Sequence, residues 1–321
     1  KNTDLVISVG TKLSDFTTGS WSNFHNPDFR LVSLNTARFD VTKHQATPLV
    51  SDAKIGLNEI SKSLGDWKAP DNWYQHARKE AQKWDQYVEQ QSGPTNQELP
   101  SYAQVIGAVY RNADPSDIVV TAAGGLVGEV VQIWKPKQIN TFETEWGFSC
   151  MGYEISGALG IKMAKPEQDV IVFVGDGSYL LNNSDIYSSV IYEKKLIIIV
   201  CDNCGHMVIN RLQLAKGGKE YLSNLKAARA TNFVEVDFAT HAASMGAETE
   251  TVTSTSELEG AFLRAKKSKK TYVIALKTHG YEWLEGTAFW ESPTLEVYST
   301  EENKKAYKEH SKGKTNQRRG V

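Results

Sequence analysis

The stretch Val170-Ile171-Val172-Phe173-Val174-Gly175-Asp176-Gly177-Ser178 decides how this chain folds. Its five apolar residues predict a buried strand, and the glycines after them predict a tight turn into a helix. A second apolar run, Leu196-Ile197-Ile198-Ile199-Val200, leads into Asp202-Asn203-Cys204-Gly205, and the segment between the two runs is long enough for one helix. Strand, turn, helix and strand in this order predict two parallel neighbouring strands whose carboxyl ends meet at one edge of a sheet.

The polar groups at these two strand ends suit a magnesium ion bound to phosphate. Asp176 offers a carboxylate, Asn203 an amide oxygen and Gly205 a backbone carbonyl. These are hard oxygen ligands, and Mg²⁺ takes few ligands from a protein and completes its shell with phosphate and water. A helix that begins after Gly177 would direct free N–H groups towards that phosphate. Because open α/β sheets bind ligands at this edge, the stretch predicts a magnesium-diphosphate site.

The arrangement resembles the signature of thiamine diphosphate (ThDP) enzymes, in which Gly-Asp-Gly is followed by a helix, a strand and an Asn. The resemblance implies that Asp176, Asn203 and the carbonyl of Gly205 bind the metal and that Gly177-Ser178 contacts the cofactor. Asp202 replaces the first residue of the usual Asn-Asn pair, a position that is not a ligand in the family. The alternative, an ordinary strand-to-helix turn, explains the glycines but not the Asn in register.

A second block, Phe148-Ser149-Cys150-Met151-Gly152-Tyr153, strengthens the resemblance. In the family, a bulky apolar residue at the position of Met151 supports the bent cofactor, and nearby groups, here including Ser149, bind its pyrimidine ring. Methionine is unbranched and polarizable, so it can fill the concave side of a bent ligand. Without its spacing to Asp176, Met151 would be interpreted as a core residue.

A glycine pair upstream is a further candidate for phosphate contact. Gly124, Gly125 and Leu126 follow the apparent strand Ile118-Val119-Val120 and lead into a helix. Glycine lets a backbone approach phosphate closely, although glycine pairs also begin ordinary helices. We therefore expect these three residues to contact the cofactor.

Composition narrows the class of protein. The 321 residues are 40% hydrophobic and carry a formal net charge of −2, so no basic field favours nucleic acid, and a small-molecule substrate is expected instead. No apolar run approaches the length of a membrane span, and no signal peptide is visible. Three cysteines do not make a disulfide framework, which favours the reducing cytoplasm. The Cys201–Cys204 pair lacks two further zinc ligands, so we interpret it as incidental and keep redox chemistry as the alternative.

The pattern of elements predicts an α/β chain with a doubly wound, mainly parallel sheet. Residues 1–66 resemble the C-terminal part of a Rossmann-like central domain, and residues 67–98 form a helical linker. Residues 99–300 alternate helix and strand and form the ThDP- and magnesium-binding domain. Residues 301–321 are a solvated basic tail.

This organisation matches the three-domain ThDP enzymes of the acetolactate synthase type, of which the chain covers the end of the central domain and the whole last domain. In that family, a glutamate of the first domain activates the cofactor, and the site forms between subunits. The resemblance therefore implies a homodimer or homotetramer assembled through the ThDP-binding domains. As given, the chain is expected to hold half of a cofactor site and to be inactive alone.

Three phrases, Asp15–Ser20, Pro48–Ala53 and Glu145–Glu154, are similar to the branch of the family that hydrolyses trihydroxycyclohexane-1,2-dione in myo-inositol catabolism. This implies hydrolytic C–C cleavage of a cyclic 1,2-diketone to 5-deoxyglucuronate. The segment Met207–Leu212 departs from the branch pattern. His206 and Glu145 are catalytic candidates, His206 also for contact with diphosphate, although either could be structural.

Two other functions remain open. The first is an acetolactate synthase-like carboligase or decarboxylase, and the second is a catalytically silent ThDP-binding fragment. A nicotinamide-binding Rossmann protein is disfavoured because no predicted strand is followed by G-x-G-x-x-G.

Overall fold

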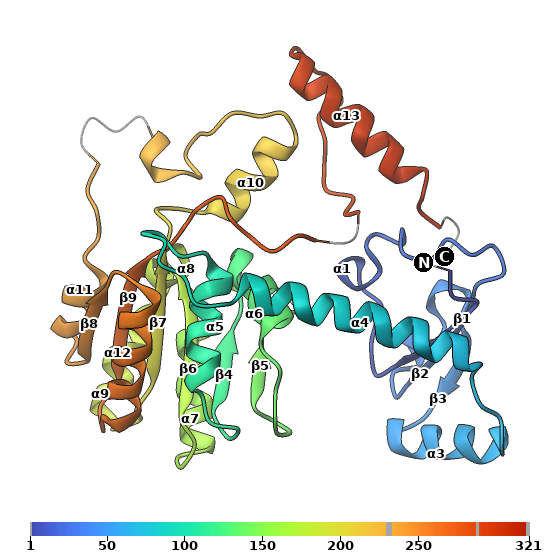
Figure 1. Ribbon diagram of the computed structural model, residues 1–321, viewed down its shortest axis with the longest axis horizontal. Helices are drawn as coiled ribbons and strands as arrows, with labels where there is room; N and C mark the ends of the chain where they lie inside the picture. Colours follow the sequence, from blue (N-terminus) through green and yellow to red (C-terminus); the bar gives the residue numbers. More distant parts are fainter. Residues whose placement is uncertain (1, 229–232, 287–288, 319–321) are drawn as a thin grey trace. The chain divides into compact units, whose positions relative to one another are not determined.

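The computed structural model describes residues 2–228, 233–286 and 289–318. They form two compact units (Figure 1). Unit 1 groups Lys1–Arg78, Ala215–Gly218 and Glu285–Val321, and unit 2 groups Lys79–Leu214 and Lys219–Leu284. In the described part of the chain, no helix is long and apolar enough to cross a membrane.

Unit 2 is built on a six-stranded sheet with the order β5-β4-β6-β7-β9-β8, and every neighbouring pair is parallel. Its central strands are apolar along their length because helices cover both faces of the sheet. This confirms the predicted α/β fold with a parallel sheet. The strands are β4 Ile118–Thr121, β5 Phe142–Thr144, β6 Val170–Gly175, β7 Ile197–Asp202, β8 Glu248–Val252 and β9 Tyr272–Lys277.

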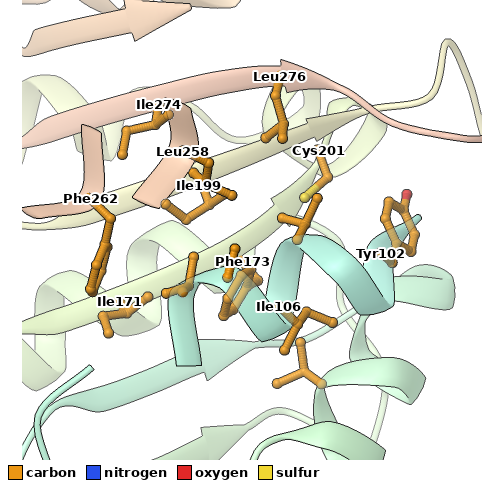
Figure 2. Close-up of a cluster of buried hydrophobic side chains, with 14 of the residues drawn as sticks. Tyr102, Ile106, Ile171, Phe173, Ile199, Cys201, Leu258, Phe262, Ile274 and Leu276 are labelled. Atoms are coloured by element: carbon orange, nitrogen blue, oxygen red, sulfur yellow. The ribbon is translucent and has the colours of Figure 1, made fainter. Parts of the chain in front are cut away.

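Alternate side chains of the central strands enter two separate apolar cores. Phe173, Ile199 and Ile274 lie in one core with residues of α5, α6 and α12 (Figure 2). Val172 and Ile198 lie in the other core with residues of α7, α8, α9 and α11. Helices thus cover both faces, as in a doubly wound sheet. They are α5 Tyr102–Asn112, α6 Gly124–Ile133, α7 Tyr153–Ala164, α8 Asp176–Leu181, α9 Asp185–Ile191, α10 Met207–Ala215, α11 Phe238–Ser244 and α12 Thr255–Lys267, with a 3₁₀ turn at Leu225–Ala227.

Unit 1 contains a three-stranded parallel sheet with the order β1-β2-β3. The helix predicted at Ala53–Leu64 is confirmed, and Asp52 caps it by accepting hydrogen bonds from two N–H groups of the first turn. The elements are β1 Leu5–Val9, α1 Asp15–Thr18, β2 Arg30–Asn35, α2 Arg38–Val41, a 3₁₀ turn at Lys43–Gln45, β3 Thr47–Val50 and α3 Ala53–Leu64.

Unit 2 begins inside the segment predicted as a linker. Helix α4, Asp71–Gln91, occupies most of that segment. Val88 is buried in the same core as Phe173, and Trp84 and Tyr87 pack against this core. The second half of α4 therefore belongs to the packed α/β unit because it contributes apolar side chains to it.

The C-terminal segment differs from the predicted solvated tail. Residues Glu301–Lys314 form helix α13, which Thr300 caps, and Asn303, Ala306 and His310 are buried within unit 1. The Asn303 amide donates hydrogen bonds to the carbonyls of Lys216 and Gly217. The helix is therefore held by these buried contacts despite its many charges. Residues 319–321 of the predicted tail lie outside the described residues.

Candidate functional site

The predicted site residues lie at the carboxyl ends of β4, β6 and β7, except for Glu145, Ser149 and Met151, which lie in the loop that follows β5. Strand β4 neighbours β6, although β5 comes between them in the chain and lies on the other side of β4. Val120 pairs with Val172, and Gly175 pairs with Cys201. The turns after these three strands therefore meet at a point where the strand order reverses, which is where open α/β sheets bind ligands.

The helix after Gly177 starts earlier and ends sooner than predicted. Helix α8 begins at Asp176 with Gly175 as its N-cap, and it ends before Asn182. Helix α9 then begins at Asp185, so two short helices replace the single predicted one. Asn182 has a non-helical φ of −151°, and the Asn183 amide donates a hydrogen bond of 3.1 Å to the Tyr179 carbonyl, so this local bond competes with the helical ladder.

Asp176 and Gly205 are in direct contact. The Gly205 N–H donates a hydrogen bond of 2.7 Å to Oδ2 of Asp176. Burial, and then the nearby carboxylate of Asp202, raise the pKa of Asp176 to about 7. Asp202 itself forms an ion pair of 2.7 Å with Lys277 and accepts a hydrogen bond from the Cys204 N–H. The carboxylate of Asp202 is therefore neutralised by a lysine side chain, whereas that of Asp176 forms no ion pair among the described residues.

Asn203 presents an amide oxygen without a partner. Its Nδ2 donates a hydrogen bond of 2.6 Å to the Tyr102 hydroxyl, and its Oδ1 is buried with no hydrogen-bond partner within the described residues. A buried polar atom without a partner is costly, so a cation or a hydrogen-bond donor bound to this oxygen would stabilise the site. Asp176, Asn203 and Gly205 therefore fit a magnesium ion in the chemistry of their donor groups.

Gly177, His206 and Met151 are close together. A Cβ atom at Gly177 would lie 2.7 Å from Cε1 of His206 and 3.3 Å from Cε of Met151. Only glycine therefore fits at this position with its neighbours in place. The His206 N–H donates to the carbonyl of Ser223 at 2.8 Å, and its ring is exposed. The structure thus brings three of the predicted cofactor residues to one place.

The turn after β4 and the loop before α7 are also joined. The Ser149 hydroxyl donates to the carbonyl of Ala122 at 3.2 Å. Gly124 has a φ of +77°, which favours glycine, and the position of a Cβ on Gly125 is 3.6 Å from Val208. The side chain of Leu126 is buried in the apolar core, so only its backbone could face a ligand.

Glu145 supports its own loop. Its two carboxylate oxygens accept hydrogen bonds of 2.8 Å from the N–H groups of Phe148 and Cys150. The bond from Cys150, and then that from Phe148, lower the pKa of Glu145. Both oxygens are thus engaged in holding the loop that leads to Met151.

All three cysteines are free thiols. Cys201 points into the core drawn in Figure 2, and burial raises the pKa of its thiol. Among the described residues, no cluster of His, Cys, Asp and Glu side chains is arranged to hold a metal ion. The Cys201–Cys204 pair therefore has no zinc partners in the described structure.

Sequence reasoning missed Tyr102 and Glu154. Tyr102 bonds Asn203 from a position far away in the chain, and an aromatic residue at the start of a helix carries no signal for that role. Glu154 is buried and bonds the N–H groups of Ala123 and Gly152. The one sequence signal for a buried role of Glu154 is its place directly before the weakly polar stretch Ile155–Leu159.

The fold and these strand-end turns place the chain in the class of open α/β domains that bind ligands at the carboxyl edge of a parallel sheet. Residues 122–276 match the C-terminal TPP-binding domain of thiamine pyrophosphate (ThDP) enzymes, and this domain of the chain belongs to that family.

Its similar proteins include three enzymes named 3D-(3,5/4)-trihydroxycyclohexane-1,2-dione hydrolase. The protein of Lacticaseibacillus casei is 31% identical over 97% of this chain and 52% of its own length. That of Geobacillus thermodenitrificans is 33% identical over 96% of this chain and 52% of its own length. That of Clostridium botulinum is 31% identical over 97% of this chain and 53% of its own length. The chain thus spans about half the length of the curated relatives it matches.

Proposed function

We propose that the complete protein is a ThDP- and Mg²⁺-dependent hydrolase of myo-inositol catabolism. It cleaves a C–C bond of trihydroxycyclohexane-1,2-dione, a cyclic 1,2-diketone, to form 5-deoxyglucuronate. One observation carries the cofactor part of the proposal: the unpartnered Oδ1 of Asn203 lies in the turn that follows β7, next to the Asp176–Gly205 contact. The names of the relatives support the substrate.

The residues of this chain would bind and orient the cofactor. Asp176, Asn203 and the Gly205 carbonyl would hold Mg²⁺. The diphosphate would contact Gly124, Gly125, the backbone of Leu126, Gly177, Ser178 and His206. The pyrimidine side of the cofactor would contact Ser149 and Met151. When bound, ThDP supplies an electron sink for the carbanion left by C–C cleavage.

A carboligase of the acetolactate synthase type is the second candidate, and one observation favours it. The segment Met207–Leu212, which departs from the hydrolase pattern, forms the first turns of α10. Val208 of this segment is the nearest neighbour of the Gly125 Cβ position, at 3.6 Å. A different side chain beside a predicted phosphate turn could change which substrate is accepted.

The experiment is an assay of the complete protein with ThDP and Mg²⁺, with the cyclic dione and with pyruvate as separate substrates. Release of the ring-opened acid supports the hydrolase, whereas acetolactate from pyruvate without dione cleavage rejects it in favour of the carboligase. No turnover of either substrate despite tight ThDP binding would identify a silent binding protein. In Asp176→Ala, Mg²⁺-dependent ThDP binding should be lost, and unchanged affinity would refute the metal site.

The proposal includes assembly and location. Helices α8 and α9 carry exposed apolar side chains, which are Leu180, Leu181, Tyr187 and Ile191, with Tyr192 directly after α9. Such a patch on an α/β domain is typical of a protein interface, and we assign it to a second copy in a homodimer or homotetramer. Three free thiols agree with a cytoplasmic location, which fractionation of cells would test.

A further inference from the structure

We propose that Glu154 is a positioning residue that holds two cofactor-binding turns in a fixed relation to each other. The inference rests on the proposed ThDP site, and it adds a residue whose side chain would not itself touch the cofactor. Glu154 lies in the first turn of α7 and is 1% exposed. A carboxylate this deeply buried is costly unless its oxygens are hydrogen-bonded, so its partners indicate what it does.

Each carboxylate oxygen of Glu154 accepts a hydrogen bond from a different turn. Oε1 accepts from the N–H of Ala123 at 3.2 Å, and Oε2 accepts from the N–H of Gly152 at 2.8 Å. Ala123 is the N-cap of α6, and Gly152 is the N-cap of α7. One side chain therefore joins the first turns of two helices that pack on opposite faces of the sheet.

Each turn contains a glycine with a positive φ, a conformation that other residues rarely adopt. Gly124, directly after Ala123, has a φ of +77°, and Gly152 has a φ of +95°. Gly152 is also enclosed, because a Cβ there would lie 2.5 Å from Cβ of Asn182. The first turn carries the predicted phosphate glycines, and the second directly follows Met151. A shift of one turn relative to the other would thus separate the two parts of the proposed cofactor site.

Only a carboxylate fits between these two donors. An ionised carboxylate is an acceptor at both oxygens, whereas a Gln amide would direct its NH₂ group at one of the two N–H groups. Burial raises the pKa of Glu154, and hydrogen bonds from the Gly152 and Ala123 N–H groups and from the Ser178 hydroxyl oppose this rise.

The test is Glu154→Gln in the complete protein, compared with Asp117→Asn. Asp117 is also a buried carboxylate of unit 2, and it accepts hydrogen bonds from Lys266. It directly precedes β4 and so lies at the edge of the sheet opposite to the proposed site. The dissociation constant of ThDP is measured at saturating Mg²⁺ by calorimetry, together with the thermal midpoint and the near-UV circular dichroism of the saturated complex. A chromophore held rigidly in an asymmetric site acquires such a signal, and a loosely held one loses it.

We expect Glu154→Gln to weaken ThDP binding about tenfold, as for the loss of a hydrogen bond to a charged group, and to reduce the signal of the saturated complex. Asp117→Asn should lower only the thermal midpoint. Unchanged affinity and signal in Glu154→Gln would overturn the inference, as would equal losses of affinity in both variants. If the unmodified protein does not bind ThDP, the proposed function itself fails.

Amide hydrogen exchange of the unmodified protein without cofactor tests the same inference without a variant. The N–H groups of Ala123 and Gly152, bonded to a buried carboxylate, should exchange slowly. Rapid exchange at both would contradict the role of Glu154, whether or not Glu154→Gln folds.

Discussion

The hydroxyl of Tyr102 accepts a hydrogen bond of 2.6 Å from Nδ2 of Asn203. With Nδ2 engaged, Oδ1 is left buried and unpartnered in the described structure. Tyr102 lies on α5, which packs on the opposite face of the sheet from α7. Its ring is part of the apolar core drawn in Figure 2. The core therefore orients a predicted metal ligand.

Tyr102→Phe should weaken Mg²⁺-dependent ThDP binding by about three- to tenfold, because the Asn203 amide loses the partner that orients it. Titration of ThDP into the complete protein at several Mg²⁺ concentrations measures this effect. Tyr110→Phe is the matched control, since Tyr110 lies on the same helix and its hydroxyl bonds the carbonyl of Lys135 at 3.4 Å. Equal affinities in all three proteins would show that the Tyr102 bond does not orient Asn203.

Gly205→Ala should destabilise unit 2 by about 2 kcal/mol. Gly205 has a φ of +147°, and a Cβ there would lie 2.4 Å from the backbone oxygen of Ser223. Gly128→Ala is the control, because Gly128 lies inside α6 with nothing within 4 Å of its Cβ position. That change should stabilise the helix by up to about 1 kcal/mol. Urea unfolding of both variants measures the difference, and similar stabilities would contradict the described conformation of the turn.

Glu129→Gln should make the protein more stable at high pH. Neither carboxylate oxygen of Glu129 has a hydrogen-bond partner within the described residues, and burial raises its pKa from 4.5 to about 7. Because the folded-state pKa is the higher one, the stability contributed by neutral Glu129 is present below about pH 4.5 and is lost as the pH rises through about 7. A Gln stays neutral throughout, so its advantage should reach about 3 kcal/mol at pH 8.

Unfolding free energies at pH 5 and pH 8 test this prediction. The control, Glu257→Gln, should show little change between these two pH values, because hydrogen bonds from Thr253 lower the pKa of the exposed Glu257 carboxyl from its ordinary value of 4.5. The stabilising contribution of Glu257 is present above about pH 4.5 and is lost only as the pH falls below that value. An advantage of Glu129→Gln that does not grow between pH 5 and pH 8 would contradict the burial of an unpaired carboxylate.

Leu181→Glu should convert the proposed oligomer to a smaller species. Leu181 is an exposed apolar residue of α8, and a carboxylate there would be buried without a partner in the proposed interface. Sedimentation velocity of the complete protein measures the effect. Leu263→Glu is the control, because Leu263 is an exposed apolar residue of α12, away from this patch. An unchanged size distribution in Leu181→Glu would exclude α8 from the interface.

Much of the fold was predictable because it follows local patterns. The apolar runs at Val170–Val174 and Leu196–Val200 are long enough to be buried strands, and both are strands of the central sheet. The tail was predicted only as a solvated basic segment, because its many charges gave no sign of helix α13 or of the buried side chains of Asn303 and His310. The single helix predicted after Gly177 was also wrong, because Asn182 has a non-helical φ of −151° and the Asn183 amide bonds the Tyr179 carbonyl in place of a helical N–H.

By itself, the sequence determined the strand-turn-helix pattern and the candidate ligands Asp176, Asn203 and Gly205, because residues close in the chain carry that signal. Only the tertiary structure decided how those groups are oriented. Tyr102 reaches Asn203, and Glu154 joins the turns at Ala123 and Gly152, only because β4, β6 and β7 are neighbours in the sheet. Strand order is set by packing between distant segments, so no local pattern contains it.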